Sequence, residues 1–202
     1  MGRTSDARQR LMDAVLNLIW SGSYGSTTID LICEKAGVKK GSFYYFFDSK
    51  ADLAATALEV GWQERRKNLD SIFSATVPPL ERLQKYCEQA YRRQAAMKAE
   101  HGAVLGCPLF TLGAEICTQD KNLRVKIQEI LNQYIKYLES AIREAEAAGL
   151  IEATKPAAKA RMLFAYYEGL LTQARILNDA EILREMADGT LVLLGVRNPA
   201  PV

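Results

Sequence analysis

One segment of this chain, from Thr27 to Lys50, constrains the fold more than any other part of the sequence; it reads TTIDLICEKAGVKKGSFYYFFDSK. Its first part places apolar side chains at helical spacing, so that one stripe faces inward over about two turns: Ile29, Ile32, Cys33 and Ala36. Gly37 then allows the left-handed backbone conformation that ends a helix, and Val38 can pack back against that helix. The segment therefore begins with a short amphipathic helix that ends at a glycine.

A second short helix follows a basic turn. Lys39, Lys40 and Gly41 form the turn, the helix begins at Ser42, and five consecutive aromatic residues come next, at positions 43–47. Two short helices joined by a glycine-containing turn make a helix-turn-helix, whose second helix can lie in the major groove of DNA. The sequence therefore predicts a DNA-binding domain here.

The polar residues of this segment suit contact with DNA. Thr27 and Thr28 stand at a helix N-terminus, where hydroxyls and backbone N–H groups meet a phosphate favourably. Thr27 can also cap this helix through its side chain. Lys39 and Lys40 lie in the turn and can reach either a phosphate or a guanine edge.

The aromatic residues divide into two pairs. Phe43 and Phe47 fall on the inward face, beside the preceding helix, and we expect them in the core of a small domain. Tyr44 and Tyr45 carry an apolar ring with a polar tip, which suits thymine methyl groups and phosphate oxygens. For these two tyrosines, contact with DNA is favoured over a place in the core.

Helical periodicity continues along the rest of the chain, and no segment has the alternation of a strand. A first helix precedes the segment and ends near Gly22, and Asp48 and Ser49 cap a connecting helix that runs to about Thr76. Further helices are expected over Leu80–Lys98, Leu109–Cys117, Leu123–Ala148, Pro156–Leu177 and Asp179–Leu194. The predicted fold is all-α.

The small positive charge of the chain lies in its first part. Residues 1–50 contain seven Lys/Arg and five Asp/Glu, a balance of +2, and the remainder contains nineteen of each. We expect the basic residues of this part to converge on one face, as nucleic-acid binding requires: Arg3, Arg8, Arg10, Lys39, Lys40 and Lys50.

Several classes of protein are disfavoured by the composition. The four cysteines lack CxxC spacing and there is one histidine, so neither a zinc site nor any other metal or cofactor is expected. No motif supplies a nucleophile, a phosphate loop or a paired acid and base, so an enzyme is not expected. No apolar run approaches the length of a membrane span and no targeting segment is visible, so we expect a cytoplasmic protein without membrane contact.

The segment also resembles the TetR family of bacterial transcriptional regulators. The resemblance rests on a Thr pair, an Ala-Gly-Val turn, a small residue before an aromatic recognition helix, and Phe-x-Ser-Lys. These stand at 27–28, 36–38, 41–45 and 47–50, and the strong match covers residues 8–60. Phe46 departs from a common variant with His at that position, which removes one possible hydrogen-bond donor to DNA.

The resemblance implies an architecture and a set of contacts. It implies DNA contacts by Ser42, Tyr44, Tyr45 and Lys50, with Lys50 on the backbone alone. It implies a helix-turn-helix domain at 1–50, a connecting helix over about 50–76, and a helical effector-binding and dimerisation domain at 77–202. Two copies would pair through the last two helices in a four-helix bundle and bind a near-palindromic operator in double-stranded DNA.

Members of the family commonly hold a small-molecule effector between helices of the effector-binding and dimerisation domain. A pocket for an apolar or aromatic effector would use aromatic, sulfur-bearing and isolated polar groups on inward faces. The candidates are Trp62, Tyr91, Cys107, Phe110, Glu115, Tyr134, Tyr137, Tyr167 and Arg175. For any single one of them, an ordinary core role is an equal alternative.

Two other modes of action stay open beside a ligand-controlled repressor. Oxidation or alkylation of Cys107 or Cys117 would make a redox- or electrophile-sensing regulator, although no basic residue adjacent in sequence lowers either thiol pKa. The other is a DNA-binding protein without an effector. In that case we expect no pocket between the helices that follow the DNA-binding domain, and little regulation.

Overall fold

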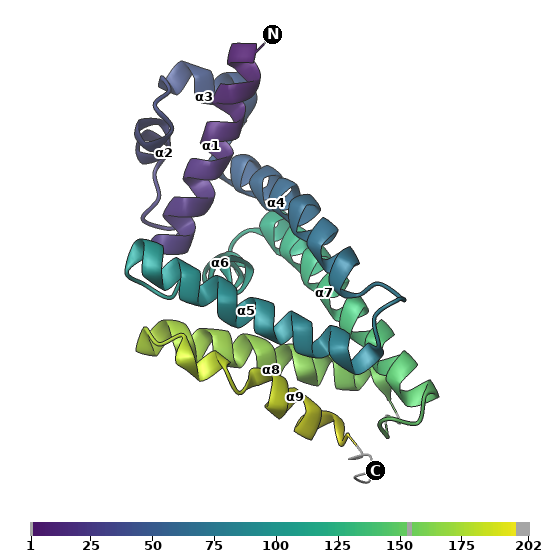
Figure 1. Cartoon of the computed structure of the whole chain (residues 1–202). Helices are drawn as coiled ribbons and strands as arrows, with labels where there is room; N and C mark the ends of the chain where they lie inside the picture. The colour runs from purple at the N-terminus through teal and green to yellow at the C-terminus, as the bar shows by residue number, and fades with distance from the viewer. Residues whose placement is uncertain (1, 153–154, 197–202) are drawn as a thin grey trace. The chain divides into compact units, whose positions relative to one another are not determined.

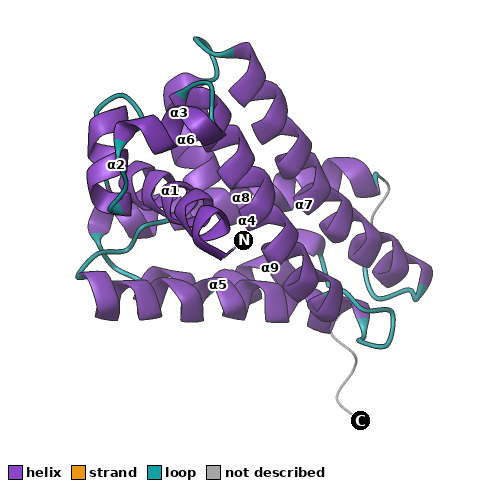
Figure 2. Cartoon of the chain, turned by 90° about the horizontal axis from the view of Figure 1, so that it is seen from above, coloured by secondary structure: helices purple, strands orange, loops and turns teal. Residues whose placement is uncertain are grey.

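The computed structural model describes residues 2–152 and 155–196, with side chains from Asp6 onward, and this part of the chain contains helices and no strand (Figure 2). The predicted all-α fold is confirmed. The helices are α1 (Gly2–Ser21), α2 (Ile29–Ala36), α3 (Lys40–Phe46), α4 (Lys50–Ile72), α5 (Pro79–His101), α6 (Pro108–Ile116), α7 (Lys121–Ala147), α8 (Pro156–Leu177), the short 3-10 helix η1 (Glu181–Leu183) and α9 (Met186–Leu194).

The chain forms two compact units. The first comprises residues 1–65 and 107–131, and the second comprises residues 66–106 and 132–202. Contacts thus group α6 and the first part of α7 with the helix-turn-helix, whereas the sequence suggests a functional boundary near residue 76. That functional boundary stays a prediction.

In the first unit, α1 packs against α2, α3 and α6, and the three N-terminal helices lie together in Figure 1. The centre of this unit is apolar, and its fully buried side chains include Leu11, Ile19, Ile32, Phe43 and Leu53. Burying a side chain of this size contributes about 1.5–3 kcal/mol relative to leaving it in water. The stripe predicted for α2 is confirmed at Ile32, Cys33 and Ala36, which are buried, whereas Ile29 at its start is half-buried.

The turn between α2 and α3 has the predicted left-handed glycine. Gly37 has φ +62° and ψ +40°, and its N–H and that of Val38 donate to carbonyls in the last turn of α2. A residue with a Cβ would be strained at this φ. The turn therefore fixes the angle at which α3 leaves α2.

The caps of the helices that flank α3 differ in one respect from the prediction. Thr28, not Thr27, caps α2: its side chain accepts a hydrogen bond from the Leu31 N–H at 3.2 Å. Ser49 caps α4 by accepting from Asp52 N–H at 3.1 Å, and the Asp52 carboxylate accepts from Asp48 N–H. The second bond differs from that of a capping box, because Asp52 accepts from the residue before the cap and not from Ser49 itself.

In the second unit, α5 packs against η1 and α9, and α8 packs against the same two helices. Its interior holds a row of rings: Tyr86 stacks on Tyr167 with centroids 4.5 Å apart, and Phe164 lies parallel to Tyr167. Arg82, only 2% exposed, bonds the Val77 carbonyl and the Glu144 carboxylate. The guanidinium thus ties the start of α5 to α7.

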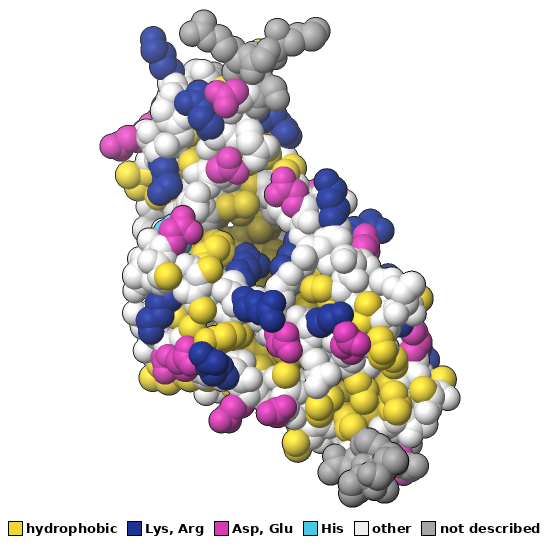
Figure 3. Space-filling view, viewed as in Figure 1, with side chains coloured by type: hydrophobic (Ala, Val, Ile, Leu, Met, Phe, Trp, Pro, Cys, Tyr) yellow, Lys and Arg dark blue, Asp and Glu magenta, His cyan; other side chains and the backbone are white. Residues whose placement is uncertain are grey.

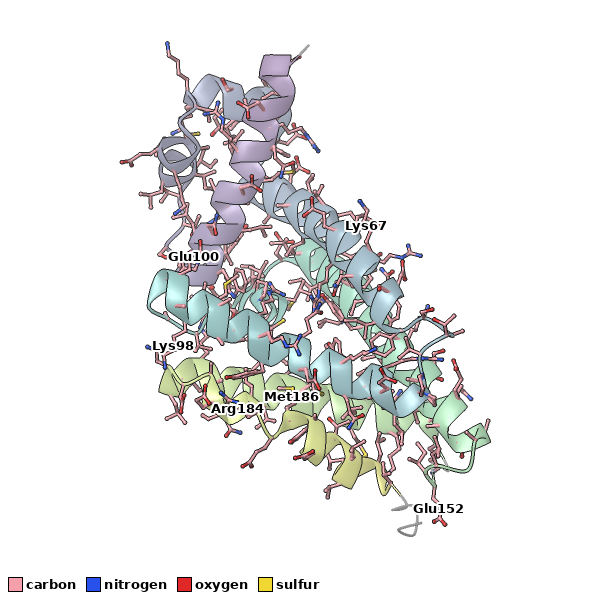
Figure 4. All side chains as sticks on the ribbon, in the orientation of Figure 1. Lys67, Lys98, Glu100, Glu152, Arg184 and Met186 are labelled. Atoms are coloured by element: carbon pink, nitrogen blue, oxygen red, sulfur yellow. The ribbon has the colours of Figure 1, made fainter. Side chains whose placement is uncertain are left out.

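The last predicted helix, from Asp179 to Leu194, is wrong as a single element. The structure breaks it into η1 and α9, with Arg184 and Glu185 between them. The Glu181 carboxylate accepts from the Tyr91 hydroxyl of α5 and pairs with Arg184, which also lies over the Tyr91 ring. These contacts hold η1 against α5, and Figure 4 shows the labelled Arg184 and Met186 on this segment.

A close approach between α8 and α9 is made possible by Gly189. An ideal Cβ at this position would lie 2.7 Å from Tyr166 Cζ and still closer to its hydroxyl. The ring of Tyr166 therefore occupies the space that a side chain at 189 would need.

Gly189→Ala is expected to lower the free energy of unfolding by about 1–3 kcal/mol, because the new methyl group forces Tyr166 to move. Gly61→Ala is the matched control, since its Cβ meets only Leu16 Cδ1 at 3.9 Å. Helix propensity there favours alanine by about 0.5–1 kcal/mol. Chemical denaturation of both variants checks this, and equal effects would contradict the close approach.

Candidate nucleic-acid interface

The recognition surface is the exposed side of α3. Phe43 and Phe47 are 0% and 3% exposed, whereas Tyr44 and Tyr45 are 55% and 73% exposed. Lys40 and Gly41 are exposed one turn earlier on the same helix, and Lys39 is exposed just before it. The aromatic pairs thus face opposite sides, as the sequence predicts, and two rings project into solvent beside two lysines.

The two threonines before α2 have different surroundings. Thr28 is exposed at the N-terminus of α2, where its hydroxyl and the first backbone N–H groups can meet an anion. Thr27 is 2% exposed, and its hydroxyl donates to the Ser23 carbonyl at 2.7 Å. Contrary to the sequence-based expectation, the Thr27 side chain stabilises the loop and offers DNA no exposed hydroxyl.

The start of α3 carries an ion pair. Lys40 Nζ lies 2.8 Å and 3.1 Å from the two carboxylate oxygens of Asp30, which is in the first turn of α2. The hydrogen bond to this carboxylate raises the pKa of Lys40. Ser42 is half-buried, and its N–H donates to the Lys39 carbonyl at 2.8 Å.

Lys50 holds the loop that precedes α2. Its Nζ donates to the Tyr24 and Thr27 carbonyls, each at 2.7 Å, and lies 4.0 Å from the centre of the Tyr24 ring. Desolvation lowers the pKa of Lys50, and the charge of Glu115 opposes this shift. An ammonium has three donors, and these two carbonyls take up two of them.

Glu115 of α6 binds the same loop from the other side. Its two carboxylate oxygens accept from the Tyr24 N–H at 2.8 Å and the Gly25 N–H at 2.6 Å. Charge-assisted bonds of this kind are about twice as strong as neutral ones. The carboxylate predicted as an effector ligand is thus engaged by backbone about 90 residues away in sequence.

The other basic residues expected on this face are partly engaged within the first unit. Arg8 lies over the Phe47 ring with Cζ 5.4 Å from its centre, and Arg10 pairs with Asp6 at 3.3 Å. The side chain of Arg3 lies outside the described residues. The face is therefore less positive than the residue count alone suggests.

The predicted effector residues fall in both compact units. Trp62, Cys107, Phe110 and Glu115 belong to the first, and the other five belong to the second. Trp62 is buried, Cys107 is half-buried and Phe110 is 38% exposed.

Those of the second unit have partners in the fold. Tyr134 lies parallel to Phe164 at 6.1 Å, and Tyr137 donates to Asp70. Arg175 donates to the Leu105 carbonyl at 3.0 Å, beside bonds from Gln94 and Asn178 to the loop at 102–106. These residues stay candidates for an effector site.

The described part of the chain lacks two other kinds of feature. No group of three or more His, Cys, Asp or Glu side chains there is placed to hold a metal ion. None of its helices has the length and apolar character needed to cross a membrane.

Comparisons with known proteins agree with this geometry. Residues 11–57 match the model of "Bacterial regulatory proteins, tetR family", and residues 79–189 match "Tetracyclin repressor-like, C-terminal domain". The transcriptional regulator AcuR of Cereibacter sphaeroides is 30% identical over 84% of this chain and 77% of its own length.

Two solved structures show the same fold. A regulatory protein TetR from Rhodobacter sphaeroides has a TM-score of 0.80 at 28% identity, covering 91% of this chain and 96% of its own. The reduced form of Escherichia coli NemR has a TM-score of 0.81 at 21% identity, covering 96% of this chain and 100% of its own.

The two sides of α3 are expected to respond differently to truncation. Phe43→Ala removes a fully buried ring and is expected to lower the free energy of unfolding by about 3–5 kcal/mol. Tyr44→Ala, one residue on, removes a ring that is more than half exposed and has an edge contact with Phe43, and it is expected to cost about 1 kcal/mol or less. Thermal or urea unfolding of the two variants measures this, and similar losses would contradict the placement of α3.

Proposed function

Because the chain belongs to the TetR family of bacterial transcriptional regulators, we propose that it is a dimeric repressor released from a near-palindromic DNA operator by a small apolar or aromatic effector. Members of the family are DNA-binding transcription factors, and they act as dimers with small-molecule effectors. The proposal includes no catalytic step and places the protein in the cytoplasm. The observation that carries it is the exposed face of α3.

In the proposed complex, α3 enters the major groove with Tyr44 and Tyr45 toward base edges. Phosphates are contacted by Lys39, Thr28 and the N-terminus of α2. These contacts position the helix-turn-helix domain, called the head, on DNA without reading its sequence. Lys50 contributes its remaining N–H to the backbone. Ser42, half-buried near the start of α3, contacts DNA by its hydroxyl.

One such head contacts only a few base pairs, so tight binding requires two. Two copies related by a two-fold axis place their recognition helices about 34–36 Å apart, in successive major grooves. The two-fold symmetry makes the operator near-palindromic, because the two half-sites meet identical domains in opposite orientations.

The proposed dimer surface lies on α8 and α9. Several apolar side chains of these two helices are buried within the subunit: Leu163, Leu171, Ala174, Met186 and Leu194. Other apolar residues of these helices are exposed, with Ile176 at 74%, Leu177 at 65%, Met162 at 59% and Val192 at 80%. Figure 3 shows hydrophobic side chains gathered near the C-terminal end of α9. Exposed apolar surface of this kind supports an interface.

The proposed route from effector to DNA runs through α6. The loop at 102–106, just before α6, is held to α5 and α8 by Gln94, Arg175 and Asn178. Further along α6, Glu115 holds the loop before α2. An effector that favours one position of the loop at 102–106 thus shifts the helix-turn-helix domain between a DNA-binding and a released state. This requires that the effector bind these two states with different affinity.

A thiol-sensing regulator is the second candidate. Cys107 and Cys117 are half-buried, whereas Cys33 and Cys87 are buried, and none of the four is in a disulfide. The burial of Cys87 raises its pKa to about 11, which disfavours the reactive thiolate.

A DNA-binding protein without an effector is the third candidate, and it would stay bound to its operator under every added compound.

The direct test is to add a library of small molecules to the purified protein bound to a defined operator. Fluorescence anisotropy of the labelled DNA measures its release. Release by one chemical class, with saturation at a one-to-one ratio of effector to subunit, supports the proposal. An operator retained under all compounds contradicts it.

The double variant Cys107→Ser/Cys117→Ser is expected to keep its response to effector, because the leading mechanism needs no thiol chemistry and serine keeps about the size of the cysteine side chain. The measurement is operator anisotropy with effector and, separately, with hydrogen peroxide. Release by peroxide in the native protein, lost in the double variant, would favour thiol sensing instead.

Val192→Glu is expected to dissociate the dimer, because a carboxylate would be buried without a partner. The loss is about 2 kcal/mol or more, or roughly thirtyfold in the dimer dissociation constant. Val125→Glu is the matched control, at a 43% exposed valine of α7 in the first unit. Sedimentation measures both, and a dimer as tight as the native one in Val192→Glu would place the interface elsewhere.

Glu115→Ala is expected to fold and to uncouple effector from DNA, because the Tyr24 and Gly25 N–H groups lose their link to α6. The ratio of operator dissociation constants with and without effector should fall toward one. Glu129→Ala, which removes an exposed carboxylate paired with Lys126 on α7, should leave this ratio unchanged. An unchanged ratio in Glu115→Ala would remove this residue from the proposed route.

A further inference from the structure

The ion pair between Asp30 and Lys40 lies beside the exposed face of α3. It joins the first turn of α2 to the first residue of α3, and its side chains are 72% and 54% exposed. A carboxylate in this place is unexpected, because a surface that approaches DNA gains from positive charge and loses from negative charge.

The stability of the fold does not account for the pair. Ion pairs between exposed side chains contribute little, since water and salt screen them. A carboxylate in the first turn of α2 also interacts favourably with the helix dipole. That effect needs no lysine at position 40, so it leaves the contact of Asp30 with Lys40 unexplained.

The pair does restrict where the Lys40 ammonium can go. Both carboxylate oxygens lie within hydrogen-bond distance of Nζ, at 2.8 Å and 3.1 Å. The negative charge of Asp30 repels a phosphate that approaches the pair, and a Lys40 that left the carboxylate for a phosphate would leave Asp30 uncompensated near the DNA backbone. An ammonium held by Asp30 can still donate to guanine O6 or N7, because it has three N–H donors.

We propose that Asp30 is a specificity-determining residue that holds Lys40 toward a guanine edge in the major groove and away from phosphates. Random DNA, which is bound almost wholly through phosphate charges, then gains little from Lys40. An operator with a G·C pair at the matching position of each half-site gains a base contact. This inference rests on the proposed DNA face of α3.

The chain offers a matched set of variants for the test. Asp30→Asn keeps the size of the side chain and removes its charge, and Lys40→Gln removes the partner. Asp13→Asn makes the same charge change in the same compact unit, at an exposed residue of α1 that is bonded to Gln9. The double variant Asp30→Asn/Lys40→Gln completes a cycle that isolates the coupling between the two residues.

The measurements are dissociation constants for the operator and for random DNA over a range of salt, and selection of preferred sites from a DNA library. In Asp30→Asn, random DNA should bind about three- to tenfold more tightly at 0.1 M salt. The salt slope should steepen by about 0.9 per head, because each head gains a phosphate contact. The ratio of operator to random affinity should fall, and one G·C position in each half-site should lose its preference.

Asp13→Asn should leave both the ratio of operator to random affinity and the selected DNA site unchanged. In the Lys40→Gln background, Asp30→Asn should have no further effect on the ratio. The inference would be overturned if Asp30→Asn and Asp13→Asn both raised the affinity for operator and for random DNA by the same factor. Asp30 would then act only as background charge. An effect of Asp30→Asn that persists without Lys40 would overturn it as well.

Tyr44→Ala, measured in parallel, separates failure of this inference from failure of the proposed function. If neither Tyr44→Ala nor Lys40→Gln changes the ratio, α3 does not read the operator and both proposals are wrong. If Tyr44→Ala lowers the ratio while Asp30→Asn behaves like Asp13→Asn, only the role of Asp30 is wrong.

Discussion

The burial of Phe43 determines which side of α3 faces solvent. This ring is fully buried, and successive residues of a helix are turned by about 100°, so Tyr44 and Tyr45 must point away from the core. Phe47, one turn later, is buried on the same side and prevents the helix from rotating. The exposed tyrosines, the ion pair of Lys40 and the proposed reading of DNA all depend on this orientation.

A second constraint is the loop before α2, which is held by opposite charges. Lys50 donates to two of its carbonyls and Glu115 accepts from two of its N–H groups, so the loop joins α4 and α6 as well as α1 and α2. In the proposed mechanism this joint carries a shift of α6 to the helix-turn-helix. It also gives Lys50 and Glu115 structural roles beside the contacts proposed for them from the sequence.

Local patterns in the sequence predict much of this structure. The stripe of α2, the left-handed Gly37, the inward Phe43 and the cap at Ser49 each depend on neighbours within one or two helical turns, where spacing decides the outcome. The bonds of Glu115 could not be predicted in this way, because they join residues about 90 positions apart. The break between η1 and α9 likewise depends on Tyr91 of α5, and the ion pair of Lys40 depends on how two helices cross. The contact of Thr27 with Ser23 depends on a loop with no periodic pattern.

The proposed function requires that two copies of α3, related by a two-fold axis, read a specific DNA site through their exposed faces. The most direct measurement is selection of fragments from a genomic DNA library by the purified protein, followed by sequencing of the retained fragments. A symmetric dimer of this kind is expected to retain one near-palindromic motif, whose half-sites lie one helical turn or a small multiple of a turn apart. Retention of fragments without a shared motif would contradict it.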